Sequence, residues 1–155
     1  NCKKLTTAPK LPATKLADYC YTYMFAYCEN LETAPDLPAK DLPQGCYSDM
    51  FYNCKNLVTG PKISATKMSK LSCQWILVNC PKLSSVTLLT PSDQMNAESA
   101  LGRWLENSGT SATTRTLVVQ DKAAYDALKS KSYLPSQWQI GLCTVQNENG
   151  DDITE

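Results

Sequence analysis

Four cysteines recur at a constant interval of 26 residues, and this interval constrains the fold more than any other feature of the chain. They are Cys2, Cys28, Cys54 and Cys80. Three units follow from them, at 2–27, 28–53 and 54–79, and a fourth unit starts at residue 80 without completing the pattern. The first two units agree at 13 of 26 positions. A fixed period of this size predicts a solenoid, in which each unit forms one coil stacked on the next.

Each unit also places apolar residues at the same positions. The columns contain Leu5, Leu31, Leu57 and Leu83, then Leu11, Leu37 and Ile63, then Leu16, Leu42 and Met68. The residues after the first column favour a short strand that pairs in parallel with its neighbours. Prolines follow at 9, 35 and 61 and predict the end of that strand, since proline cannot donate to a ladder. Residues 18–27 and their equivalents have helical apolar spacing, which predicts a short helix on the convex side.

The period stops after residue 90. The later sequence predicts a helix beginning at Asn96, with Leu101, Trp104 and Leu105 on one face, and a strand over 116–119. Asp121 is the expected N-cap of a helix through residue 128, and a final strand is expected over 139–145. Because a solenoid needs its last coil covered, residues 91–155 are predicted to form a mixed α/β cap. The alternative is that they form a small functional domain of their own.

The junctions between units carry a family resemblance. Residues 25–31 read Phe-Ala-Tyr-Cys-Glu-Asn-Leu and residues 51–57 read Phe-Tyr-Asn-Cys-Lys-Asn-Leu, whereas Leu77 replaces phenylalanine before the next cysteine. This Phe-x-x-Cys-x-x-Leu pattern resembles the BspA-like leucine-rich repeats of surface proteins from anaerobic commensal bacteria. Residues 135–138, Pro-Ser-Gln-Trp, resemble the Pro-x-x-Trp ending that follows such arrays.

The resemblance implies both a fold and a function. The fold is α/β: a leucine-rich-repeat array over 1–90, with a parallel sheet on the concave side and short helices on the convex side, capped by 91–155. The function is that of a non-enzymatic protein, exported and either anchored at the bacterial outer membrane or secreted. It would act as a monomer that binds or adheres to a protein ligand on host or neighbouring cells, without a cofactor.

The cysteine pattern allows three chemical interpretations. Zinc sites normally show close cysteine pairs, and no Cys-x-x-Cys occurs here. Disulfides suit an exported protein, but side chains stacked on successive coils point in parallel and do not face each other. The third interpretation is a structural ladder of small buried thiols. Its members are Cys2, Cys28, Cys54 and Cys80. Cys20 and Cys46 form a second ladder, which stops in the third unit because Ser72 occupies the aligned position and Cys73 lies one position later.

Positions that vary from unit to unit are the candidate protein-binding residues, because solenoids commonly bind through their concave face. One row contains Thr6, Glu32, Val58 and Ser84, and another contains Lys10, Asp36, Lys62 and Leu88. The alternative is an ordinary solvated sheet face. A third row is expected to be a structural hydroxyl ladder, and it contains Thr7, Thr33, Thr59 and Ser85.

Six of the eight tyrosines fall between residues 19 and 52. They could form an aromatic contact surface for protein or carbohydrate. The alternative is that about half of them pack sideways between adjacent coils with their hydroxyls in solvent.

Composition excludes several functions. The chain has no histidine, which rules out Ser-His-Asp triads, Cys-His dyads and HExxH metal sites. Fifteen basic and fifteen acidic residues cancel, so there is no electrostatic argument for nucleic acid. No apolar run reaches the ~20 residues of a membrane span. The charges divide, however, into 10 basic and 6 acidic residues up to Thr90 and 5 basic and 9 acidic residues beyond it, with Glu148, Asp151, Asp152 and Glu155 in an expected solvated tail.

Three functional hypotheses follow: a protein-binding adhesin, a structural spacer that presents another domain, and a carbohydrate-binding module or enzyme in the C-terminal segment around Trp104 and Trp138. The chain begins in phase within a unit, since Asn1 matches Asn53 and Asn79. We therefore expect an uncovered N-terminal edge and a longer parent protein.

Overall fold

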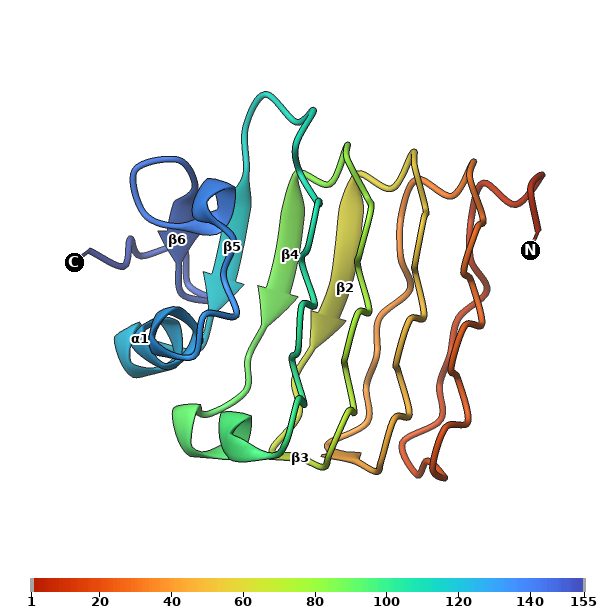
Figure 1. Cartoon of the computed structure of the whole chain (residues 1–155), viewed down its shortest axis with the longest axis horizontal. Helices are drawn as coiled ribbons and strands as arrows, with labels where there is room; N and C mark the ends of the chain where they lie inside the picture. The colour runs from red at the N-terminus through yellow and green to blue at the C-terminus, as the bar shows by residue number, and fades with distance from the viewer. Residues whose placement is uncertain (1, 155) are drawn as a thin grey trace.

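Segments one period apart lie side by side along the long axis of the molecule, with the two termini at opposite ends (Figure 1). The structure, a computed structural model, describes residues 2–154, so Asn1 and Glu155 and the expectations that involve them lie outside it. Within that range the fold is α/β, with parallel strands and one α-helix. Its elements are β1 (Asp41–Leu42), β2 (Thr59–Ile63), β3 (Lys67–Met68), β4 (Ser85–Leu88), η1 (Ser92–Asn96), β5 (Thr116–Val119), α1 (Lys122–Ser130), η2 (Ser136–Trp138) and β6 (Thr144–Gln146).

A four-stranded parallel sheet has the order β2-β4-β5-β6. Isolated parallel bridges from Thr7 to Thr33 and from Thr33 to Thr59 extend the same pairing to the first two units, which confirms the expected parallel strands. A second, two-stranded sheet pairs β1 with β3. The sequence predicted that Pro61 ends its strand, and this prediction is wrong. Pro61 lies inside β2, where the register shifts between Thr59 and Lys62, a type of irregularity that tolerates proline.

The prediction of helices on the convex side is wrong. Residues 18–27, 44–53, 70–79 and 98–107 form consecutive turns instead, and we call these the turn segments. Alternate amides donate to the next turn segment, as in Tyr21 N to Cys46 O at 3.0 Å and Phe25 N to Met50 O at 2.9 Å. The intervening amides close short turns within the segment, as in Thr22 N to Tyr19 O at 3.2 Å. Every second amide therefore serves a neighbouring segment, which is incompatible with an α-helix.

The same ladder crosses residue 90, where the sequence period stops. Leu71 N donates to Glu98 O and Leu77 N donates to Trp104 O, each at 3.0 Å. The prediction of a helix beginning at Asn96 is therefore wrong, because η1 ends at Asn96 and the fourth turn segment follows it. The unit that begins at Cys80, expected to remain incomplete, thus closes a fourth layer over residues 80–107.

Residues 108–154 add strands and a helix to the end of the stack. The strand over 116–119 is confirmed as β5, which pairs in parallel with β4. The helix is confirmed as α1, and Asp121 caps it by accepting from Ala124 N at 2.8 Å. The last strand, β6, is shorter than expected. The acidic tail is exposed, but it folds back: Asn147 N donates to Asp151 O, and Ile153 N donates to Val145 O.

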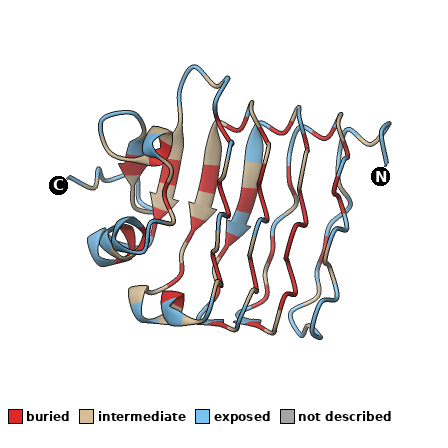
Figure 2. Cartoon of the chain, in the orientation of Figure 1, coloured by how far each residue is buried: buried red, intermediate tan, exposed pale blue. Residues whose placement is uncertain are grey.

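The core lies between the strands and the turn segments (Figure 2). The leucine column is fully buried at Leu31, Leu57 and Leu83, and the rings of Phe25 and Phe51 stack with centroids 5.6 Å apart. Burial of this apolar area is the main term that stabilises such a fold. The two tryptophans of the C-terminal segment, Trp104 and Trp138, are also fully buried, so they offer no open aromatic cleft for carbohydrate.

Candidate binding surface

The exposed side of the four-stranded sheet and of the bridges that extend it is called here the strand face. Its first candidate row lies immediately before the first residues of consecutive strands and bridges. Glu32 N donates to Thr6 O at 3.3 Å, Val58 N to Glu32 O at 2.9 Å and Ser84 N to Val58 O at 2.8 Å. Thr6, Glu32 and Val58 are exposed, and Val58 leaves 41% of its surface in solvent. Arg115, which the sequence analysis missed, continues the row because Thr116 N donates to Ser84 O and Thr144 N to Arg115 O.

The second candidate row is brought together in part. Lys10 and Asp36 line one hollow of about 300 Å³, and Asp36 and Lys62 line a second of about 360 Å³. Leu88 does not belong to this row. The register shift in β2 pairs Lys62 with Thr87, and Leu88 pairs with Ile63 in the core, where it is fully buried. The row therefore continues through Thr87.

The hydroxyl row is longer than the sequence indicated. Parallel pairing connects Thr7, Thr33, Thr59, Ser85, Thr116 and Thr144 in that order. The last two members were missed because intervals of 31 and 28 residues replace the 26-residue period there. The signal that could have found Thr116 is the alternation of outward and buried residues in Thr-Leu-Val-Val, where Leu117 and Val119 are fully buried.

The C-terminal tail reaches this face. Glu148 Oε1 lies 3.4 Å from Lys62 Nζ, and both side chains are about half exposed. An ion pair this exposed contributes little to stability. It does mean that a ligand on Lys62 must displace or share the contact with Glu148. Among the described ion pairs, none involves Lys10 or Asp36.

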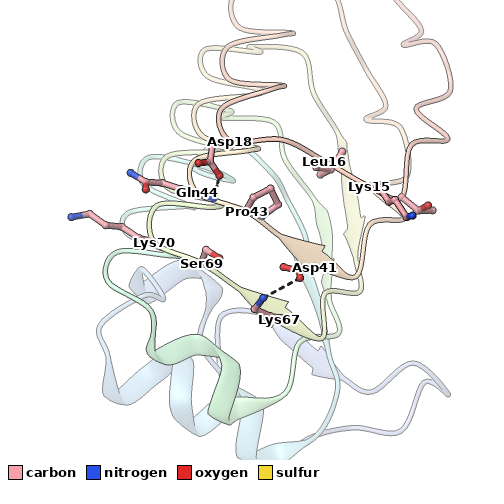
Figure 3. A pocket seen from close by; sticks show the side chains of 10 residues that line it. Lys15, Leu16, Asp18, Asp41, Pro43, Gln44, Lys67, Ser69 and Lys70 are labelled. Carbon is pink, nitrogen blue, oxygen red and sulfur yellow. Dashed lines mark hydrogen bonds and ion pairs between the residues drawn. The ribbon is translucent and has the colours of Figure 1, made fainter.

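A separate groove of about 510 Å³ lies beside β1 and β3 (Figure 3), and no residue of the candidate rows lines it. Its carboxylates are engaged singly. Asp18 Oδ1 accepts from Gln44 N at 3.0 Å, and Asp41 Oδ2 accepts from Lys67 Nζ at 3.0 Å. General acid/base chemistry on a glycosidic bond needs two carboxyls that converge on one substrate. In this groove, Asp18 instead accepts a hydrogen bond from a backbone amide, and Asp41 forms an exposed ion pair with Lys67.

The eight cysteines are free thiols in this structure. Cys28, Cys54 and Cys80 are fully buried as expected, and so is Cys46 of the second ladder. The expectation of burial is wrong for Cys2 and Cys20, which are exposed because no layer covers the N-terminal edge among the described residues. Cys54 Sγ donates to Phe25 O at 3.1 Å and Cys80 Sγ to Phe51 O at 3.2 Å.

Burial makes the inner thiols poor nucleophiles. It raises the pKa of Cys54 and of Cys73 to about 12 each and raises that of Cys80 well above its ordinary value. A thiol reacts as the thiolate, so these groups are protonated and inert at neutral pH. Their arrangement supports a packing role.

The tyrosines divide between packing and exposure. Tyr47 is buried and stacks on Tyr21 with ring centroids 6.1 Å apart. Tyr19, Tyr23 and Tyr27 are exposed on the first turn segment, at 49%, 52% and 43%. Tyr23 hydrogen-bonds to the buried Asp49. Burial raises the pKa of the Asp49 carboxyl, although the hydrogen bonds from Ser48 and Tyr23 act in the opposite direction. Aromatic residues thus lie both inside the stack and on its outer side.

Two further properties hold for residues 2–154, the range that the structure describes. No group of three or more histidine, cysteine, aspartate or glutamate side chains there could hold a metal ion. No helix in the same range is long and apolar enough to cross a membrane. Comparisons with protein-family models, with curated proteins and with solved structures found no match to this chain.

Proposed function

We propose that the chain is a leucine-rich-repeat solenoid of the BspA-like type and that it is a non-enzymatic binding protein with a protein ligand. The repeated Phe-x-x-Cys-x-x-Leu junctions support the family, and backbone hydrogen bonds between segments one period apart support the solenoid. Export to the bacterial surface, or secretion, follows from the same resemblance. In this proposal the protein acts as a monomer in adhesion to host or neighbouring cells.

One observation carries the binding role. The strand face presents three rows of side chains across successive strands. Their chemistry changes along the first and second rows, whereas the third row carries hydroxyls throughout. The first row runs from Thr6 through Glu32, Val58 and Ser84 to Arg115, so it offers hydroxyl, acid, apolar, hydroxyl and basic groups in sequence. A surface that only had to be solvated gains nothing from an exposed Val58, and a mixed pattern on a rigid backbone suits recognition of a protein.

The experiment immobilises the full chain and measures binding of purified host extracellular-matrix proteins and mucins. Two strand-face variants, Val58→Arg and Asp36→Lys, are expected to weaken any binding at least tenfold, because each places a long cation in the contact surface. The matched controls are Met24→Arg and Asp93→Lys, which make the same kinds of chemical change at exposed positions outside the rows. They are expected to bind like the unmodified chain.

Two results contradict the proposal. A chain that binds nothing across the panel behaves as a structural spacer, which is the competing function. A ligand whose affinity falls equally in the strand-face variants and in the controls binds elsewhere on the molecule.

A further inference from the structure

A hollow of about 260 Å³ lies on the turn segments, away from the rows of the strand face. Its apolar wall is formed by Tyr52, Trp75 and Val78, and its polar rim is formed by Asn79, Arg103, Glu106 and Asn107. Residues from the second, third and fourth units therefore meet there. None of them belongs to the candidate rows.

Trp75 is exposed where folding alone would not place a tryptophan. It leaves 37% of its surface in solvent and has a left-handed backbone with φ of 55°. Glycine, asparagine and aspartate adopt this conformation at least cost, and a bulky side chain there is strained. The equivalent positions in other units carry Tyr23, Asp49 and Arg103, each also left-handed. Left-handed residues recur in this way along all four turn segments, so the conformation belongs to the fold and does not require an aromatic side chain. The exposed ring of Trp75 is therefore not explained by the backbone.

The rim of the hollow offers hydrogen bonds that the fold uses only in part. Asn107 Nδ2 donates to Asn79 Oδ1 at 3.1 Å, and no bond from the amide hydrogens of Asn79 or to the carbonyl oxygen of Asn107 is present among the described side chains. Arg103 Nη1 and Glu106 Oε2 lie 3.7 Å apart, and both side chains are well exposed, so the contact between them is weak. Donors and acceptors thus surround an aromatic wall.

The charge and size of the hollow narrow the ligand class. Arg103 and Glu106 cancel, so the hollow has no net charge to attract a phosphate, sulfate or sialic acid. Its volume is just below the range of about 300–1,000 Å³ for drug-sized ligands. An aromatic face beside side-chain amides, a carboxylate and a guanidinium matches a sugar ring, which has one apolar face and a rim of hydroxyls.

The wall continues beyond the hollow. The ring of Tyr52 meets that of Tyr27 edge to face with centroids 5.6 Å apart, and Tyr27 is 43% exposed. A chain of several sugars seated at Trp75 could therefore lie along a second aromatic surface. From this geometry we propose that the hollow around Trp75 binds a neutral oligosaccharide, independently of any protein ligand on the strand face.

Tryptophan fluorescence gives a direct test on the full chain. Trp104 and Trp138 are fully buried, so acrylamide quenching and ligand-induced changes report on Trp75. We would titrate chitotriose, cellotriose, maltotriose and mannotriose as neutral probes, with sialyllactose as the acidic probe. At least one neutral probe is expected to protect Trp75 from quenching, and sialyllactose is expected to bind at least tenfold more weakly.

The decisive variant is Trp75→Asn, which removes the ring and keeps a residue suited to the left-handed backbone. Because it also removes the packed part of the ring, circular dichroism and the melting temperature are measured to establish that the variant is folded. Calorimetric titration should show at least tenfold weaker sugar binding. Tyr23→Asn is the matched control, because Tyr23 occupies the equivalent position and lies outside the hollow. It should leave sugar affinity unchanged.

Three results would overturn the inference. The first is that no neutral probe binds, and the second is that binding is unaffected by Trp75→Asn. The third is that Trp75→Asn weakens a protein ligand while sugars do not bind, which would make the hollow part of a protein interface. Strand-face variants such as Val58→Arg should leave sugar affinity unchanged, so this test can fail or succeed independently of the protein-binding function.

Discussion

At the level of single residues, the cysteine column is a repeated packing and hydrogen-bonding device. Cys54 and Cys80 each fill a small space, and each donates to a carbonyl 29 residues earlier, Phe25 O and Phe51 O. Ser108 continues the column directly after the fourth unit, and its hydroxyl donates to Leu77 O. A small side chain with one donor is therefore what the position requires, and the thiol chemistry itself is not used.

The buried thiols predict a loss of stability at alkaline pH. The pKa of Cys54 and Cys73 rises from an ordinary 9.0 to about 12 in the folded chain. The folded state therefore keeps protons that the unfolded state releases, so this contribution to stability is complete below pH 9 and falls between pH 9 and 12. Each thiol adds a slope of up to about 1.4 kcal/mol per pH unit. Urea denaturation midpoints measured from pH 7 to pH 10 check this.

The matched variant for that measurement is Cys54→Ser, which keeps a hydroxyl donor, as Ser108 has, and removes one titrating group. Its stability is expected to fall less steeply above pH 9 than that of the unmodified chain. Equal slopes in the two proteins would contradict the assignment of the alkaline loss to the buried thiols.

At the level of elements, the turn segments depend on residues that accept a left-handed backbone. The first position of this type is Tyr19, and its equivalents are Gly45, Leu71 and Ser99, all with positive φ. Gly45 has an additional constraint, because a Cβ at this position would collide with the ring of Tyr19 in the neighbouring unit. The glycine therefore lets the second turn segment lie directly against the ring of Tyr19 in the first.

Gly45→Ala is expected to lower the free energy of unfolding by about 1–2 kcal/mol for the left-handed backbone alone, and by more because the Tyr19 ring must move. Tyr19→Ala alone should cost less, since Tyr19 is half exposed. In the double variant the collision is relieved and the backbone cost remains, so the two effects should not add. Denaturant unfolding of the four proteins measures this coupling, and strict additivity would contradict it.

The turn segments also show why part of the fold was predictable from sequence and part was not. The period located the parallel strands, and the cap at Asp121 located α1, because both signals are local and specific. Buried residues in the fourth turn segment recur in pairs every four positions, at Ala100 and Leu101 and at Trp104 and Leu105. Over ten residues that spacing cannot be distinguished from a helical period of 3.6, so the sequence predicted helices.

The candidate surface was predictable to the same extent. The strand-face rows up to Ser84 follow from the constant period. Their extension through Arg115 and Thr144 does not, because the intervals between units change after residue 90. The hollow at Trp75 gave no signal either, since it combines residues from three units whose positions depend on turns that the sequence did not predict.

At the level of the whole molecule, the stack and the C-terminal segment are joined by the sheet and by two reciprocal contacts. Trp104 Nε1 in the fourth unit donates to Tyr133 O at 2.9 Å, and Trp138 Nε1 donates back to Ser108 O at 3.0 Å. Both rings are fully buried. Since β5 also pairs along its full length with β4, the segment that closes the stack shares its hydrophobic core.

This continuity predicts that the chain unfolds as one unit. Trp138→Ala removes a fully buried ring and should cost about 3–5 kcal/mol, although Gln137 Nε2 still donates to Ser108 O. Trp104 fluorescence follows the junction, and near-ultraviolet circular dichroism follows the stacked tyrosines of the first two units. In Trp138→Ala, both signals should shift together to a lower denaturant midpoint. The midpoint of Trp138→Phe should lie between those of Trp138→Ala and the unmodified chain. A tyrosine transition that stays at its original midpoint would show that the repeats fold independently of the segment that closes them.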